Sequence, residues 1–188
     1  MAGVEFAAGA GPGRRRRAAE LRWQEPTTRL ALRWGTYRGR YLAGLLLIVG
    51  GLLHLQSSTT HLLWPLVVGT VAHTIGWWIL PAAGWRRLVV PLACGVQVWL
   101  LLTGPQSMWT LLIPYCAWLL VRHRPAVSYT TVPAVAANGV LAIVLFREYA
   151  QMPLALLMSA VVLSGSAWAA RFLAAARKTK ASAGRMFK

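Results

Sequence analysis

The segment from residue 61 to residue 80, HLLWPLVVGTVAHTIGWWIL, most constrains what this chain can fold into. It is 20 residues long and contains no Asp, Glu, Lys or Arg. As an α-helix it is ~30 Å long, which matches the hydrocarbon thickness of a bilayer. Trp64 lies near its first end and Trp77 and Trp78 near its second, where aromatic rings meet lipid headgroups. The segment therefore predicts a transmembrane helix.

Five further apolar runs have the same character, and 57% of the 188 residues are hydrophobic. The pattern predicts an all-α polytopic membrane protein with six transmembrane helices. Their approximate bounds are residues 41–55, 61–80, 88–103, 108–121, 129–146 and 152–172. We expect residues 37–172 to form one transmembrane domain. A basic, largely disordered arm of residues 1–36 precedes it, and a basic tail of residues 173–188 follows it.

The distribution of the basic residues predicts the orientation. Of the 20 Lys and Arg, all except Arg147 fall in or beside the arm, the turns at 81–87 and 122–128, and the tail. The positive-inside rule then predicts that both termini are cytoplasmic, in the plasma (inner) membrane. The Ala- and Arg-rich, Lys-poor composition is typical of a GC-rich bacterial genome.

The arm contains a run of four arginines, Arg14, Arg15, Arg16 and Arg17. A basic segment just before a membrane span is typical of a cytoplasmic arm on anionic lipid headgroups. Binding to nucleic acid is the alternative, because arginine runs also neutralise phosphates. No folded binding module accompanies the run, so we expect lipid as the partner and no nucleic acid.

The acidic residues exclude several classes of enzyme. The chain has four, Glu5, Glu20, Glu25 and Glu148, and no Asp. Magnesium-dependent phosphoryl or prenyl transfer needs carboxylate ligands, and proton relays usually need Asp or Glu inside the membrane. No acid falls inside a predicted span, so neither chemistry is available. We therefore expect no enzymatic activity.

The histidines and cysteines give no strong metal motif. Cys94 and Cys116 both fall in apolar runs and form neither a disulfide framework nor a zinc pattern. His54 and His61 flank the first predicted outer loop and could share a haem or metal there, but no nearby Cys or acid extends the set. We expect no cofactor and no metal.

Several polar residues lie at similar depths in the predicted spans. At ~1.5 Å per residue, His73, Gln97, Asn138 and Ser164 fall within a few ångströms of one plane, with Thr70 and Tyr115 close to it. Because polar groups in lipid are costly, we expect these side chains to point inward and bond one another. They form either a polar site that binds or passes a solute, or interhelical hydrogen bonds that fix helix register.

Small residues indicate where helices approach closely. Gly44, Gly50 and Gly51 mark the first span, and Ala160, Ser164 and Gly165 mark the sixth. The Ser164-Gly165-Ser166 sequence, with His73 as base, is also a candidate for an intramembrane serine protease, although no oxyanion donors are identifiable. Pro114 lies inside the fourth span and predicts a kink near Tyr115.

The functional expectation follows from how little of the chain lies outside the predicted spans. We expect a non-enzymatic accessory or assembly subunit that acts through helix contacts and anionic-lipid contacts, as a homo-oligomer or in a larger membrane complex. The alternative is a small permease or channel that uses the polar plane around His73, Gln97 and Asn138.

Overall fold

A computed structural model describes residues 26–29, 35–82 and 84–186 of the chain, and these residues are helical apart from short turns. Within them there is no strand, only an isolated bridge between Thr59 and Leu62. The expected lipid-binding arginines, Arg14–Arg17, lie outside the described residues. The chain divides into a large unit, Glu25–Ala174, and a second unit of residues 1–24 and 175–188.

The helices follow the predicted spans, with shifted ends. The structure contains α2 (Tyr37–Gln56), α3 (Trp64–Ile79), α4 (Arg86–Leu100), α5 (Leu112–Val121), α6 (Val132–Leu145) and α7 (Met152–Met186). Short 3₁₀ helices are η1 (Pro26–Arg29), η2 (Leu101–Thr103), η3 (Pro105–Leu111), η4 (Ala126–Thr131) and η5 (Tyr149–Gln151). The expected basic tail therefore begins as a continuation of α7.

Four helical segments are long and apolar enough to cross a membrane: Tyr37–Gln56, Arg86–Thr103, Ala126–Leu145 and Tyr149–Arg177. The segment at 61–80 forms a helix of only 16 residues, α3. Its start is set by Pro65 in the first turn, where a missing N–H costs least. Its end is set at Leu80, which precedes Pro81 and adopts an extended ψ of 136°.

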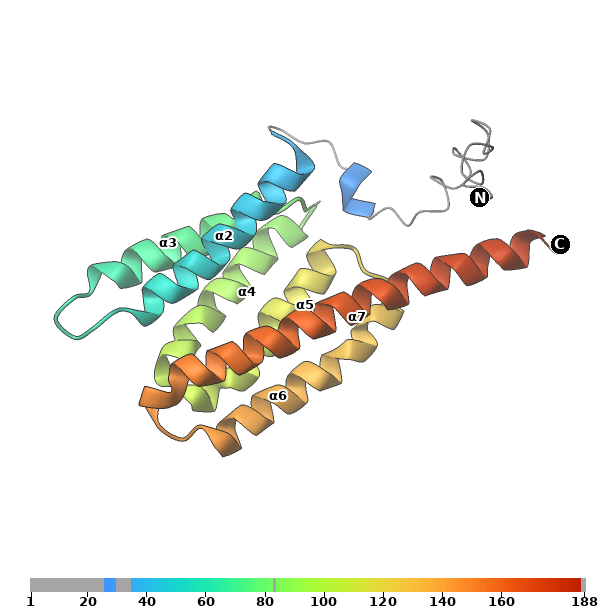
Figure 1. The fold of residues 1–188 in the computed structure, drawn as a ribbon. Helices are drawn as coiled ribbons and strands as arrows, with labels where there is room; N and C mark the ends of the chain where they lie inside the picture. Colours follow the sequence, from blue (N-terminus) through green and yellow to red (C-terminus); the bar gives the residue numbers. More distant parts are fainter. Residues whose placement is uncertain (1–25, 30–34, 83, 187–188) are drawn as a thin grey trace, which may run out of the picture. The chain divides into compact units, whose positions relative to one another are not determined.

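The helices of the large unit pack as neighbours along the chain (Figure 1). α2 packs on α3, α3 on α4 and α4 on α5, while η3 packs on α6. One buried cluster joins α3, α4 and α5 around Trp77, Cys94 and Val121. A second joins η3, α6 and α7 around Met108, Ala142 and Ala155. A third includes Tyr115, Val135 and Ala170.

α2 and α3 approach each other through glycines. A Cβ added to Gly51 would lie 2.6 Å from the backbone nitrogen of His73 and 2.7 Å from the carbonyl oxygen of Gly69. Seven residues away on each helix, a Cβ on Gly44 would lie 2.9 Å from the carbonyl oxygen of Gly76. Backbone therefore faces backbone, and only glycine fits this contact. The pairs Gly51–Gly69 and Gly44–Gly76 fix the register of the antiparallel helices α2 and α3.

The prediction of close contacts is confirmed for Gly44 and Gly51, whereas the other small residues make no close helix contact within the described residues. A Cβ on Gly50 or Gly165 would meet nothing within 4 Å among the described residues. Ala160 and Ser164 are exposed on the outward face of α7. A kink is expected near Pro114. The helix changes from the 3₁₀ form of η3 to the α form of α5 at Leu112, two residues before Pro114.

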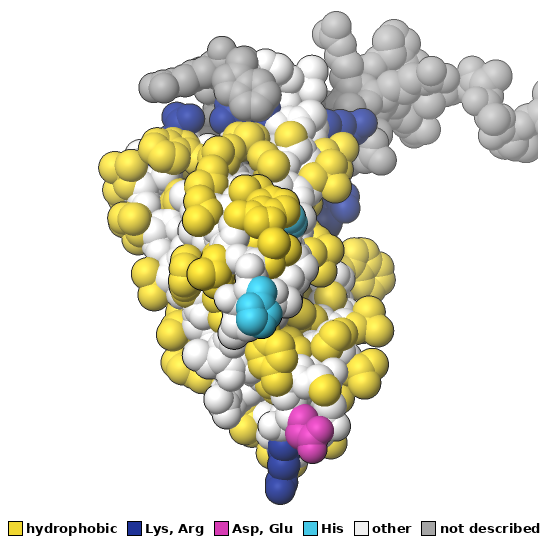
Figure 2. All heavy atoms as spheres, turned by 90° about the vertical axis from the view of Figure 1, so that its left-hand side faces the viewer, with side chains coloured by type: hydrophobic (Ala, Val, Ile, Leu, Met, Phe, Trp, Pro, Cys, Tyr) yellow, Lys and Arg dark blue, Asp and Glu magenta, His cyan; other side chains and the backbone are white. Residues whose placement is uncertain are grey.

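The outer surface is apolar between two polar ends. On the face drawn in Figure 2, hydrophobic side chains extend from Lys and Arg at one end to neighbouring acidic and basic side chains at the other. Exposed large hydrophobic residues come from all of α2, α3, α4, α6 and α7, and include Leu46, Val67, Leu92, Val140 and Val161.

Candidate functional site

His73 is one of the buried polar residues that the sequence singled out. Its side chain is buried between α2 and α3. The indole N–H of Trp77 donates to His73 Nε2 at 3.1 Å, and His73 Nδ1 lies 3.1 Å from the carbonyl oxygen of Ile48. Because an indole only donates and a carbonyl only accepts, Nε2 is unprotonated and Nδ1 carries the proton. The ring is therefore neutral, and both nitrogens are bonded inside the hairpin.

Gln97 bonds in a different place. Its Nε2 donates to Thr110 Oγ1 at 3.3 Å, and the Thr110 hydroxyl donates to the carbonyl oxygen of Ser107 at 2.6 Å. Gln97 and Thr110 are each about 1% exposed, so this contact between α4 and η3 excludes solvent.

Asn138 forms a third separate contact, between α6 and α7. Its Nδ2 donates to Ser159 Oγ at 2.9 Å, and the Ser159 hydroxyl points to Met108 Sδ at 3.9 Å. Asn138 Oδ1 is buried and has no hydrogen-bond partner among the described residues. The amide therefore keeps one unused acceptor inside the bundle.

Tyr115 and Thr70 are also accounted for locally. Tyr115 Oη lies 2.5 Å from Thr131 Oγ1, which joins α5 to η4. Nearby, the Ser128 hydroxyl donates to the carbonyl oxygen of Ala170 in α7 at 2.9 Å. The Thr70 hydroxyl donates to the carbonyl oxygen of Leu66 at 2.6 Å, within α3 itself.

The inward position expected for Ser164 is wrong, because its side chain is exposed. Buried α7 residues recur at helical intervals of three, four or seven, and the stripe consists of Met152, Ala155, Ser159, Ser166, Ala170 and Ala174. Ser164 lies off this stripe, whereas Ser159 lies on it. The spacing is visible in the sequence and would have selected Ser159 as the partner of Asn138.

The polar residues at similar depth therefore do not converge on one site. In the described ranges, no hydrogen bond links any two of His73, Gln97 and Asn138. Likewise, no three His, Cys, Asp or Glu side chains of the described residues could hold a metal ion. Cys94 is a buried free thiol, and Cys116 is a half-buried one.

The basic end of the helices contains contacts that the sequence reasoning missed. Arg122 Nη1 donates to Tyr37 Oη at 2.5 Å, and its guanidinium lies 4.3 Å from the ring centroid of Tyr41. Buried Arg40 donates from Nε and Nη2 to the carbonyl oxygen of Ile79, at 3.2 and 2.9 Å. A cation there satisfies a free carbonyl at the end of α3. These arginines hold helix ends together.

Arg86 and His123 form a second contact at this end. His123 adopts a left-handed φ of +51° in the turn after α5. Its Nδ1 accepts a hydrogen bond from Arg86 Nη1 at 2.6 Å. Burial and the nearby charge of Arg86 lower the pKa of His123 below its ordinary value of 6.5, because both disfavour the imidazolium. A cation and a neutral base therefore face each other here.

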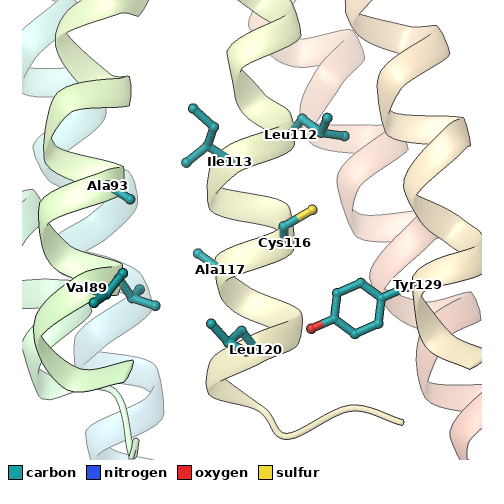
Figure 3. A pocket seen from close by; sticks show the side chains of 9 residues that line it. Val89, Ala93, Leu112, Ile113, Cys116, Ala117, Leu120 and Tyr129 are labelled. Carbon is teal, nitrogen blue, oxygen red and sulfur yellow. The ribbon is translucent and has the colours of Figure 1, made fainter. Parts of the chain in front are cut away.

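An apolar groove of about 460 Å³ lies between α4 and α5 and was not foreseen (Figure 3). Its walls include Val89, Val90 and Ala93 of α4, and Ile113, Ala117 and Leu120 of α5. Cys116 and the ring of Tyr129, from η4, complete it. The small side chains of Ala93 and Ala117, placed between larger ones at helical spacing, leave the space open.

Comparison of the chain with protein-family models, with curated proteins and with solved structures finds no match.

Proposed function

We propose that this chain is a plasma-membrane protein with six transmembrane helices and cytoplasmic termini. In this proposal it acts as a non-enzymatic accessory or assembly subunit, through contacts with other helices and with anionic lipid. The carrying observation is that its mid-helix polar groups bond in separate pairs inside the chain, while its outer surface is apolar.

The directions of the helices support six crossings. α2, α4 and the η4–α6 segment each follow basic residues, and all three are candidate spans. For three spans to run the same way, the chain must return between them, through α3 and through η3–α5. The 16 residues of α3 reach ~24 Å, and η3 with α5 reaches ~29 Å. Both are close to the ~30 Å hydrocarbon core.

The charges at the two ends support cytoplasmic termini. Arg38, Arg86, Arg87 and Arg122 lie at the end where α2 and α4 begin, whereas Arg147 and Glu148 lie in the opposite α6–α7 turn. Positive charge gathers on the cytoplasmic side of membrane proteins.

The pairing of polar groups favours an accessory subunit over a permease. A permease needs a polar path shared by several helices, with groups that can bind a solute or a proton. Both nitrogens of His73 are already bonded, and Gln97 bonds to Thr110. These contacts resemble the interhelical hydrogen bonds that fix register.

One face of α7 is suited to contact with a helix of another subunit. Ser164 and Gly165 are exposed in the middle of this apolar helix, beside exposed Trp168. Small residues permit the close backbone approach that α2 and α3 use inside the chain. A partner helix here would also shield the Ser164 hydroxyl from lipid.

The orientation is tested with reporters fused after Lys188 and inserted into the turn at residues 57–60. We expect activity of a cytoplasm-specific reporter at the first position and of a periplasm-specific reporter at the second. The reverse pattern would overturn the proposed orientation, and recovery of the chain in the aqueous fraction would overturn the membrane assignment.

The function is tested by purification in mild detergent and by solute flux into proteoliposomes. We expect a stoichiometric complex of defined mass. Gly165→Leu should disrupt this complex, because Gly165 lies on the proposed contact face of α7. Gly50→Leu is the matched control and should leave the complex intact, since both glycines face open space within the described residues. We expect no flux dependent on His73. A monomeric protein with pH-dependent flux that is lost in His73→Ala would refute the accessory role.

One observation keeps the permease as the second candidate. Asn138 Oδ1 is a buried acceptor that no described residue satisfies, and such an atom can bind a solute or water inside a bundle. Solute flux that is lost when Asn138 is substituted is therefore expected of a permease and not of an accessory subunit.

A further inference from the structure

Among the described residues, no charged side chain lines the groove between α4 and α5, but Arg86 lies about one helical turn before Val89, at what we call its basic end. One face of α4 carries Arg86, Val89, Val90 and Ala93, because the last three lie three, four and seven residues after Arg86. On α5, Ile113, Ala117 and Leu120 form the matching stripe, and His123 follows one turn later. Arg86 and His123 meet at 2.6 Å, so both stripes end in the same polar contact.

The groove is shorter than one leaflet of a bilayer. From Arg86 to Ala93 is seven residues, and so is the distance from Leu120 back to Ile113. Seven residues of helix rise ~10 Å, and half of a hydrocarbon core is ~15 Å. The groove therefore starts at the basic end and stops before the bilayer centre, in the leaflet that faces the cytoplasm under the proposed orientation.

The basic end can hold an anion. Arg86 uses one N–H for His123, and a guanidinium has five. Its charge also interacts with the phenol of Tyr129, which lines the same end of the groove (Figure 3). Glu148, the one acid among the described residues, lies in the turn at the other end of α6. A phosphate beside Arg86 would therefore meet no opposing carboxylate of the described residues.

We infer that this groove binds an anionic phospholipid of the cytoplasmic leaflet, with one acyl chain between α4 and α5 and its phosphate on Arg86. Charge complementarity selects this occupant, because an apolar slot that ends in an arginine matches a chain that ends in a phosphate. A volume of about 460 Å³ also lies within the ~300–1,000 Å³ typical of ligand sites. The inference rests on the membrane placement proposed above, but not on the accessory role.

The test uses the full chain in nanodiscs of phosphatidylcholine with a minor share of phosphatidylglycerol. Lipids that remain bound after detergent extraction are counted by native mass spectrometry. We expect phosphatidylglycerol to be retained well above its share of the bilayer. Arg86→Gln should lower this excess about fivefold, the effect of one arginine at an anionic surface. Arg38→Gln is the matched control, since Arg38 is an exposed arginine on α2 at the same end.

A second pair of variants tests the apolar part. Ala93→Leu fills the groove and should abolish the excess, whereas Ala137→Leu, on the exposed face of α6, should leave it unchanged. A spin label on Cys116 in a Cys94→Ala protein provides an independent readout in the unfilled groove. We expect the label to be less mobile in discs containing phosphatidylglycerol than in phosphatidylcholine alone.

Three results would overturn the inference: retention no higher than the bulk share, equal effects of Ala93→Leu and Ala137→Leu, or a dimer that Ala93→Leu dissociates without a change in bound lipid. A chain that enters nanodiscs with six spans and shows one of these results refutes only the lipid site. A chain that fails to enter nanodiscs refutes the proposed membrane placement instead.

Discussion

The α2–α3 contact and the α4–α5 groove are built from the same kind of small residue, with opposite results. In the first, Gly51 faces Gly69 and the two backbones nearly touch. In the second, Ala93 and Ala117 line a space of about 460 Å³. The difference is that glycines of α2 and α3 face each other at two heights, whereas Ala93 and Ala117 lie among larger Val, Ile and Leu side chains that line the groove.

The comparison shows that a small residue in a membrane helix does not by itself predict close helix packing. Close packing requires small residues on both helices at the same height. Where larger neighbours set the separation, small residues create a groove instead. The following predictions test this difference, starting with the largest expected effect.

Adding one methyl group to the close contact should have the largest effect. In Gly51→Ala the new Cβ would lie 2.6 Å from the backbone nitrogen of His73, so α2 and α3 must separate. We expect a loss of about 1–3 kcal/mol in the free energy of unfolding, the usual cost of overpacking. Unfolding in mixed micelles, followed by circular dichroism, measures it.

Two controls sharpen this prediction. Gly50→Ala meets nothing within 4 Å and should be neutral or slightly stabilising, because alanine favours helix. Ala93→Leu adds more atoms than Gly51→Ala but should cost less, since the groove has room for them. If Ala93→Leu is the more destabilising change, the contrast between the two regions is wrong.

Removing the histidine of the α2–α3 contact should have the next largest effect. His73→Leu breaks the bonds to Ile48 and Trp77 and leaves the Trp77 N–H buried without its acceptor. We expect a loss of about 1–2 kcal/mol. A double-mutant cycle with Trp77→Phe should give a coupling of ~0.6 kcal/mol or more. Additive single effects would mean that the indole–imidazole bond does not hold the hairpin together.

Replacing Asn138 should have little effect on stability. Its amide has one buried oxygen without a partner among the described residues, so Asn138→Leu removes an unsatisfied acceptor as well as the bond to Ser159. We expect a change within about 1 kcal/mol of zero. Flux into proteoliposomes is measured on the same variant. A solute flux that disappears in Asn138→Leu would favour the permease.

The smallest expected effect concerns pH at the basic end of the groove. The pKa of His123 is lowered on folding, so the unfolded chain binds its proton more tightly. The stability that His123 contributes is therefore fully present above its unfolded pKa of 6.5 and decreases as the pH falls below that value.

His123→Asn tests this, because asparagine tolerates the left-handed φ of +51° and carries no titrating group. We expect its stability to depend less on pH between 7 and 5 than that of the unmodified chain. Parallel profiles for the unmodified chain and His123→Asn would contradict the prediction.

The sequence by itself determined the class of the molecule, and only the tertiary structure decided which side chains meet. Runs without charge, such as residues 61–80, predicted helices because hydrophobicity and length are local properties. Counting residues placed His73, Gln97 and Asn138 at similar heights, since the rise per residue is constant.

Height along a helix says nothing about rotation about its axis, which advances by about 100° per residue and is set by packing against neighbours. Ser159 rather than Ser164 meets Asn138, and because five residues of helix rise ~7.5 Å, the counted height of the partner was wrong as well as its rotation. Rotation decided that His73 bonds within α2 and α3 rather than to Gln97. It also decided that Gly51 faces Gly69 while Gly50 faces open space. The groove beside Ala93 exists for the same reason, because the separation of two helices depends on which side chains they turn toward each other.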